Sequence, residues 1–394
     1  LVGSEMCIRD RVYLLCTSFG RRLLAESAYE VLLLYVARPY NGLCYISCIH
    51  VMIYYTLPIL SFVIAFIRLN KRRCTPLVVI LLLLCFVVGA LRGEGVGADY
   101  YAYLRIFLHG DETMEAGFSE LIRIIKWFGG DYFHLIVLVF SLSFFTKYYV
   151  FRKMSPNPYL SLMIYLGFWF LSYEMNGIRQ GLALGFIGVA VYHAWKGKMF
   201  FYWIFIGLAI SVHNSALVFL PFAFFVGRPC TQGIQLIFLF IYVVLLFVDV
   251  LDPLISKIGG DLYAVKKVMD YSMDDFYNGN ILYSFSTVHR VMITGLIVYA
   301  VPRMKIDDRL KNIFLWSALF NMAIYLLFGQ IEIVATRLSL NYRFVECMTL
   351  AGLPSLPSRK ENRLIIAYLL FGYVLIQVYS VLSIPDGKLI PFHF

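Results

Sequence analysis

The 394-residue chain is 61% hydrophobic and 15% charged, with a mean hydropathy of +0.76, which is typical of integral membrane proteins and excludes a soluble enzyme. Its net charge of +10 does not indicate nucleic-acid binding, because the lysines and arginines form short clusters between apolar runs, where they set topology. The eight cysteines show no CxxC pair and no metal-ligand spacing, so we expect no disulfide framework, metal or cofactor.

The N-terminal residues stand apart from the rest of the chain. Residues 1–11 (LVGSEMCIRDR) resemble a translated sequencing adapter and are left out of the predicted fold. Residues 12–47 are ambiguous and complete an N-terminal extension, 1–47, outside the predicted domain. Met52, just before the apolar run from Ile53 to Ile67, marks the start that we expect. The sequence therefore predicts a single transmembrane domain over residues 48–394.

Apolar runs then recur along the chain with only short polar breaks and two longer loops, 92–131 and 252–285. A helix needs about 20 apolar residues to cross the hydrocarbon core. We therefore predict an all-α fold, a polytopic transmembrane helix bundle of roughly 10 to 12 spans. The runs cover 51–67, 77–91, 132–150, 159–174, 180–195, 233–251, 286–302, 311–328, 338–354 and 364–382.

The apolar stretch 199–226 is long enough for one span or for two half-length helices that meet near His213. Basic clusters at 68–73, 147–153 and 196–198 place those loops in the cytoplasm and loop 92–131 outside. If 199–226 crossed once, the later clusters 303–311 and 359–363 would both lie outside. We therefore predict a broken, re-entrant hairpin with His213 at its tip, which also places loop 252–285 outside.

Within the first outer loop, Phe118, Leu121, Ile122, Ile125 and Phe128 follow a helical period, with charged residues opposite. This pattern predicts an amphipathic helix on the outer membrane surface. Its role is either anchoring or gating the access of a lipid substrate.

The densest polar cluster at membrane depth runs from Glu174 to Gln180, at the outer junction of two spans. Asn176 precedes Arg179 and Gln180 by three and four residues, so we expect all three on one helix face. Arg179 offers a planar fork of donors that suits a diphosphate leaving group; alternatively, it snorkels to the interface or pairs with Glu174. Glycines at 177, 181 and 185 predict close packing of a neighbouring helix.

His213 lies in an apolar run and is followed by Asn214 and Ser215, both good N-cap residues. A helix N-terminus inside the membrane attracts anionic oxygens. His213 is therefore a candidate general base or diphosphate donor, with Asn214 in the binding site. The alternative is a structural histidine.

Further candidates lie on the same predicted side. Arg337 and Arg343 near the start of a late span add cationic groups, but their spacing lets at most one of them line the site; the alternative is interfacial anchoring. Asp99 is the best outer-loop candidate for acid or base work, and Tyr101 beside it can stack on a sugar. Asp274 and Asp275 are adequately explained as solvated loop charges; the alternative is a metal-binding or acceptor-binding role.

Several of these motifs occur together in a characteristic order. Gly97-x-Asp-Tyr100 follows the second span, Arg179-Gln180 opens a later span, His213-Asn-Ser-Ala216 lies in the next apolar run, and Arg343 lies near the late span. Over roughly Met52 to Leu382, the chain resembles the EpsG-type family of Wzy-like polysaccharide polymerases.

The resemblance implies a metal-independent glycosyltransferase of the bacterial cytoplasmic membrane. It would join polyprenyl-diphosphate-linked oligosaccharide units into exopolysaccharide, capsule or O-antigen chains at the outer face. Its partners would be the bilayer, that lipid-linked substrate, and the flippase and chain-length regulator of the same pathway. The residues alone leave open a ligase, a flippase for lipid-linked sugars and a membrane acyltransferase with His213 as base, although no internal repeat supports a transporter.

The hairpin makes a topological prediction. A cysteine introduced beside Asp274 should be labelled by an impermeant reagent from the outer face, whereas one within 227–232 should be labelled only from the cytoplasmic face. Labelling of the Asp274 position only from inside would show that 199–226 crosses the membrane once.

Overall fold

The computed structural model describes residues 43–69, 75–248 and 281–384, together with 388–390, 392 and 393. Its contacts divide the chain into two units, Leu1–His50 and Val51–Phe394, and all of the predicted site residues belong to the second unit. The extension through residue 42, most of the basic cluster 68–73, and residues 252–280 with Asp274 and Asp275 lie outside the described residues.

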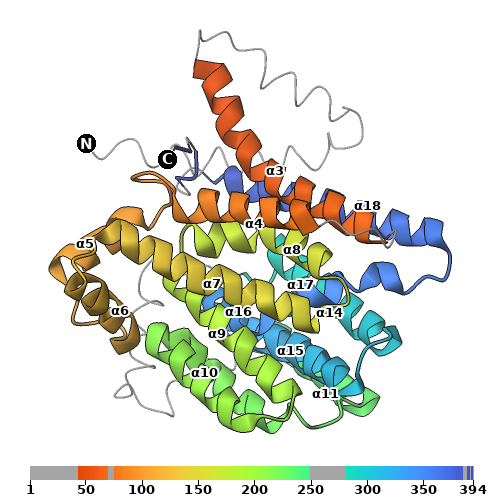
Figure 1. Ribbon diagram of the computed structural model, residues 1–394. Helices are drawn as coiled ribbons and strands as arrows, with labels where there is room; N and C mark the ends of the chain where they lie inside the picture. The colour runs from red at the N-terminus through yellow and green to blue at the C-terminus, as the bar shows by residue number, and fades with distance from the viewer. Residues whose placement is uncertain (1–42, 70–74, 249–280, 385–387, 391, 394) are drawn as a thin grey trace, which may run out of the picture. The chain divides into compact units, whose positions relative to one another are not determined.

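The described residues form helices and no strands (Figure 1), which confirms the predicted all-α class. The elements, in chain order, are α3 (Leu43–Leu69), α4 (Thr75–Ala90), α5 (Tyr100–His109), α6 (Ala116–Trp127), α7 (Tyr132–Met154), α8 (Pro158–Gly167), η1 (Phe170–Glu174), α9 (Ile178–Trp195), α10 (Met199–Val212), η2 (Asn214–Phe224), α11 (Gln232–Phe247), α14 (Phe285–Ala300), η3 (Val301–Arg303), α15 (Asp308–Leu327), α16 (Glu332–Arg343), α17 (Glu346–Leu350), η4 (Leu353–Ser355) and α18 (Lys360–Leu382).

In this described part, four helical segments are long and apolar enough to cross a membrane: α7, α14 with η3, α15 and α18. Shorter apolar helices occupy other predicted spans. Helix α11 buries none of its residues and exposes large apolar side chains such as Leu236 and Phe240. Such a continuous apolar surface is suited to lipid and unsuited to water, so the chain is a polytopic helical membrane protein.

The stretch 199–226 is broken and doubles back, as predicted. His213 has an extended backbone between α10 and the 3-10 helix η2, and the Tyr202 hydroxyl near the start of α10 donates to the carbonyl of Phe219 in η2, 3.1 Å away. Both ends of the stretch lie beside the first half of α15. The Trp195 indole donates to Asp307, and the Trp316 indole donates to the carbonyl of Arg228.

Two predicted spans are not continuous α-helices. The run 159–174 forms α8 and then the π-helix η1, and the run 338–354 contains a break between α16 and α17. At this break Phe344 packs against Phe151 and Trp169. Hydropathy does not register such breaks, because it averages over a window of residues and does not depend on the backbone conformation within that window.

The glycines on α9 have the packing role that their spacing predicts. A Cβ atom on Gly181 would lie 2.5 Å from the carbonyl oxygen of Tyr173, and one on Gly185 would lie 2.4 Å from Thr146 Oγ1. Helix α9 therefore approaches both η1 and α7 more closely than any larger residue permits.

The assignment of Lys147 to a cytoplasmic basic cluster is wrong. Its side chain is fully buried and pairs with Glu174 of η1, which also accepts hydrogen bonds from Ser143 and Tyr165. Arg152, in contrast, is exposed. A buried carboxylate needs a charged partner and several donors, so this cluster fixes η1, and with it the start of α9, against α7.

Breaking this pair should destabilise the protein. Lys147→Met and Glu174→Gln each leave a buried group without its partner, and each should cost about 3 kcal/mol of unfolding free energy. The double variant removes both charges and should recover most of the loss. Thermal unfolding in detergent measures the stability of each variant. Lys311→Met, which breaks the exposed pair with Asp308, is the control. Single variants as stable as the control would contradict this role.

Candidate functional site

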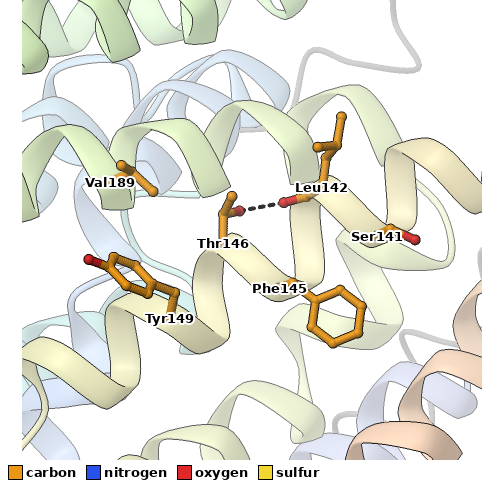
Figure 2. Close-up of a pocket in the computed structure, with 6 residues that line it drawn as sticks. All are labelled: Ser141, Leu142, Phe145, Thr146, Tyr149 and Val189. Atoms are coloured by element: carbon orange, nitrogen blue, oxygen red, sulfur yellow. Dashed lines mark hydrogen bonds between the residues drawn. The ribbon is translucent and has the colours of Figure 1, made fainter.

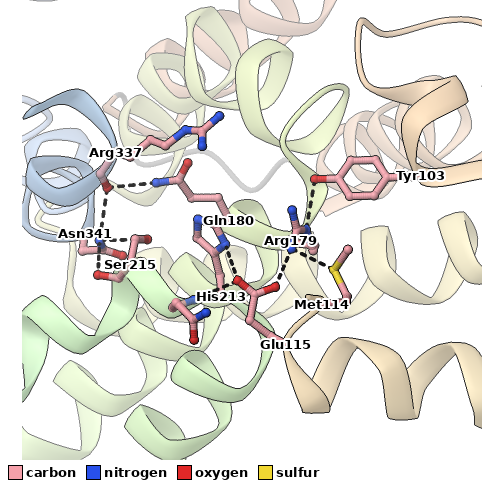
Figure 3. A network of polar contacts seen from close by, with 10 residues as sticks. Tyr103, Met114, Glu115, Arg179, Gln180, His213, Ser215, Arg337 and Asn341 are labelled. Atoms are coloured by element: carbon pink, nitrogen blue, oxygen red, sulfur yellow. Dashed lines mark hydrogen bonds and ion pairs between the residues drawn. The ribbon is translucent and has the colours of Figure 1, made fainter. Parts of the chain in front are cut away.

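Most of the predicted site residues line one cavity of about 170 Å³. It lies where the α5–α6 segment meets the start of α9, the tip of the α10–η2 hairpin and α16 (Figure 3). Its lining consists of Asp99, Ala102, Tyr103, Ile106, Gly177, Arg179, Gln180, His213 and Arg337. The fold thus gathers groups from four separated parts of the chain.

Arg179 is the second residue of α9 and is held in place by the α5–α6 segment. Its Nη1 atom pairs with Glu115, and its guanidinium lies over the rings of Tyr103 and Phe118, 5.6 and 5.9 Å from their centroids. The alternative pairing with Glu174 is wrong, because Glu174 faces Lys147.

Sequence reasoning missed Glu115, which contacts two of the residues that line the cavity, Arg179 and His213. It immediately precedes α6, and its side chain turns away from that helix to lie between Arg179 and His213 (Figure 3). Oε1 accepts a hydrogen bond of 3.1 Å from the backbone amide of Asn214 and lies 3.4 Å from His213 Nδ1. In the sequence it resembles any other solvated loop carboxylate; its one signal is its place directly before the amphipathic helix.

The surroundings of Glu115 keep it ionised. Burial alone raises its pKa, but the contact with His213, the charge of Arg179 and the Asn214 amide outweigh burial and hold the pKa at about 2, below the ordinary value of 4.5. At neutral pH Glu115 is therefore ionised, and it acts as an acceptor rather than as a proton donor.

The predicted amphipathic helix is present as α6, but it is more than a surface anchor. It buries Phe118 and Ile122, and it approaches the hairpin so closely that a Cβ atom on Gly117 would lie 2.3 Å from Ser211 Oγ. Through this packing, α6 holds Glu115 against the hairpin tip.

At that tip, the backbone of the hairpin contributes more than the predicted side-chain caps. His213 occupies the N-cap position of η2, with no side-chain capping bond; Asn214 contributes its backbone amide. The predicted capping by Asn214 and Ser215 is therefore wrong. His213 lines the cavity, and both of its ring nitrogens are buried without a hydrogen bond of standard geometry.

Gln180 and Asn341 tie α16 to the other walls. The Gln180 amide donates to the Arg337 carbonyl at 3.0 Å, and the Asn341 amide donates to the Ser215 carbonyl at 3.0 Å. These two hydrogen bonds fix the position of α16 and therefore the place at which Arg337 lines the cavity. As its spacing from Arg343 required, only one of the two arginines does so.

Four predicted site residues do not line the cavity: Asn214, which donates its backbone amide to Glu115, and Arg343, Tyr101 and Asn176. Arg343 is buried in an ion pair with Glu346, 2.8 Å away, and Tyr101 is 52% exposed. Asn176 precedes the start of α9 and so does not share its helix face with Arg179; its Oδ1 accepts from the Ala98 amide at 2.6 Å.

The contact between Ala98 and Asn176 explains why the motif begins with Gly97. Gly97 has φ of +108°, and a Cβ atom there would lie 2.3 Å from the Met175 carbonyl oxygen. Only glycine lets this loop pass so close to the turn before α9, and the loop then delivers Asp99 to the cavity rim.

A second hollow, of about 420 Å³, lies on the surface of α7 and α9 and is lined by Ser141, Leu142, Phe145, Thr146, Tyr149 and Val189 (Figure 2). The Thr146 hydroxyl donates to the Leu142 carbonyl at 2.6 Å, so the wall it presents is apolar. This groove suits a lipid tail and offers no group for chemistry. Among the described residues, no three His, Cys, Asp or Glu side chains come together as metal ligands.

Fold and cavity together define a polytopic helical membrane protein with a site that contains two arginines, a histidine and an aspartate. The model of the EpsG family matches residues 74–394. The chain therefore belongs to the EpsG family, a family of Wzy-like polysaccharide polymerases. No curated protein and no solved structure matches it.

The depressed pKa of Glu115 predicts a pH-dependent contribution to stability. The ionised carboxylate stabilises the fold fully above about pH 4.5, and this contribution is lost as the pH falls toward 2. Glu115→Gln should therefore be less stable than the wild type near pH 7, by on the order of 3 kcal/mol. The difference in unfolding free energy between the wild type and Glu115→Gln should fall by more than half near pH 3. Glu120→Gln, at an exposed pair on α6, is the control; a Glu115→Gln gap that does not change with pH would contradict the ionised state.

Proposed function

We propose that this protein joins lipid-linked oligosaccharide units by glycosyl transfer. A hydroxyl oxygen of one unit attacks the anomeric carbon of another, and the bond from that carbon to a polyprenyl diphosphate breaks. The diphosphate leaves with the electron pair, and the hydroxyl proton passes to a base. The observation that carries this proposal is the convergence of His213, Arg179, Arg337 and Asp99 on one cavity, in a chain of the EpsG family.

His213 is the base in this scheme. A proton on Nδ1 points to the ionised Glu115, which leaves Nε2 as the acceptor that faces the cavity. The Glu115 carboxylate orients the ring and stabilises the imidazolium that forms when the attacking hydroxyl loses its proton. The 3.4 Å separation of Nδ1 and Oε1 shortens when substrate is bound, as catalytic hydrogen bonds do.

The arginines receive the leaving group. Arg179 uses Nη1 for Glu115, while its Nη2 atom makes no hydrogen bond to a described residue. Arg337 lines the same cavity from α16. Two guanidinium groups stabilise the charge that develops on a departing diphosphate more than the charge on the intact donor.

Asp99 and Tyr103 complete the pocket for the sugar. Asp99 is exposed on the cavity rim, where a carboxylate accepts hydrogen bonds from sugar hydroxyls. Tyr103 presents its ring beside Arg179. In the cell, the site would open at the outer face of the bacterial cytoplasmic membrane, where a flippase supplies the substrate and a chain-length regulator acts on the product.

The test is purified protein in liposomes with lipid-linked oligosaccharide. Ladders of longer glycan support the proposal. A change in the sidedness of the substrate without elongation would indicate a flippase, an acylated sugar would indicate an acyltransferase, and either result alone would overturn it.

Arg179 is the sharpest residue to test. Lysine keeps the charge but loses the planar fork, so Arg179→Lys should be nearly as damaging as Arg179→Ala, with rates lower by about 10²–10³. The measurement is polymer formed per unit of membrane-inserted protein. Arg123→Lys at the exposed Glu120 pair is the matched control. A fully active Arg179→Lys at normal abundance would remove Arg179 from the leaving-group site.

A further inference from the structure

A second arginine, Arg290, is buried at a place that the proposed reaction does not use. It lies on α14 and is 6% exposed, although its neighbours Val291 and Met292 are exposed apolar residues of the kind that face lipid. None of the ion pairs between described residues includes it.

The contacts of Arg290 satisfy only part of its guanidinium. Nη1 donates to Ser339 Oγ at 3.2 Å, and the group lies over the Tyr325 ring, 4.0 Å from its centroid. Its Nε atom is buried without a hydrogen-bond partner. One hydroxyl and one ring do not offset the burial of a cation in an apolar span. The site therefore lacks an anion.

The surrounding polar groups have the same imbalance. Arg343 and Glu346 are the charged neighbours of Arg290, and because they pair with each other, the cluster keeps one excess positive charge.

The cluster borders the lipid-facing surface between α14 and α18. His289, next to Arg290, contacts the Tyr373 hydroxyl at 3.1 Å, and both residues are only partly buried. Met292 and Ile376, each 68% exposed, flank this contact with apolar surface. Arg290 is about 8 Å along the helix axis from the start of α14, a depth that a phosphate near the membrane surface reaches from the lipid side.

Helix α16 separates this cluster from the cavity. Arg337 lines the cavity, whereas Ser339 and Arg343 follow it by about 200° and 240° around the helix axis and so lie on the side toward Arg290. The two cationic sites are thus about one helix diameter apart. Glycosyl transfer between two lipid-linked units involves two diphosphates, one that leaves and one that stays on the acceptor.

We propose that Arg290 binds the diphosphate of the second lipid-linked substrate, which reaches it from the bilayer between α14 and α18. This assignment rests on the proposed function, because the proposed reaction involves two lipid diphosphates. Three observations support the proposal. The guanidinium of Arg290 has no ion-pair partner among the described residues, it lies beside the lipid-facing surface, and α16 separates it from the cavity.

The experiment measures binding without turnover. Wild-type protein in phosphatidylcholine nanodiscs is titrated with a long-chain polyprenyl diphosphate. We expect two molecules per protein. Arg290→Met should remove one of them or weaken it at least about tenfold, and Arg179→Met should affect the other. Arg303→Met, at an exposed arginine that also lies over a tyrosine ring, is the control and should keep both.

A structural role for Arg290 gives different results. If Arg290 only ties α14 to α16, Arg290→Met lowers the melting temperature of the ligand-free protein and keeps both sites, which overturns the proposal. We expect a melting temperature equal to or above that of the wild type, because an unpaired buried charge is removed. Should the methionine variant not fold, Arg290→Lys serves instead: about tenfold weaker binding supports the proposal, and unchanged affinity overturns it.

Two further arms identify the ligand and separate this proposal from the proposed function. If phosphatidylglycerol or inorganic diphosphate binds at the Arg290 site as tightly as the polyprenyl diphosphate does, the assignment of this site to a diphosphate lipid is overturned. If Arg290→Met loses one site while Arg179→Met loses none, the leaving-group role of Arg179 fails and the Arg290 site stands. The opposite result removes the Arg290 site and leaves the proposed reaction intact.

Discussion

The whole site depends on one buried carboxylate. Glu115 is the anion against which Arg179, the His213 ring and the Asn214 amide are placed. These donors come from α9 and from the hairpin tip, and each would stay solvated or repel the others without an acceptor between them. Because Glu115 is fixed by α6, the packing of that helix on the hairpin determines the geometry of the cavity. A loop segment thus positions groups that belong to the membrane-embedded helices.

The buried charges of the described residues differ in how fully they are satisfied. Lys147 and Glu174 have each other and further hydrogen bonds, and Arg343 has Glu346; these pairs fix helices against one another. Arg290 has no ion-pair partner among the described residues, and we have proposed that it binds a ligand. Arg92, which is also buried and outside those pairs, donates instead to the carbonyls of Gly89 and Glu174.

Helix α16 is the element on which the two cationic sites depend. It is tied to α9 through Gln180 and to the hairpin through Asn341, so Arg337 is set in the cavity wall. Its opposite side carries Ser339 and Arg343 toward α14. One short helix, ended by the break at Phe344, thus separates the cavity from the Arg290 cluster, the two places that we have proposed for the two lipid diphosphates.

The sequence by itself determined the membrane class, the helical fold and the doubled-back hairpin, and it singled out Arg179 and His213, which line one cavity, because hydropathy, charge asymmetry and cations in apolar runs are local properties of the chain. The tertiary structure alone decided the partners. Nothing local distinguishes Glu115 from a solvated loop carboxylate or Lys147 from a topological lysine, and nothing local tells that Arg343 is paired while Arg290 is not. Which charges meet depends on how helices far apart in the chain pack, and that packing is set by contacts that no periodicity records.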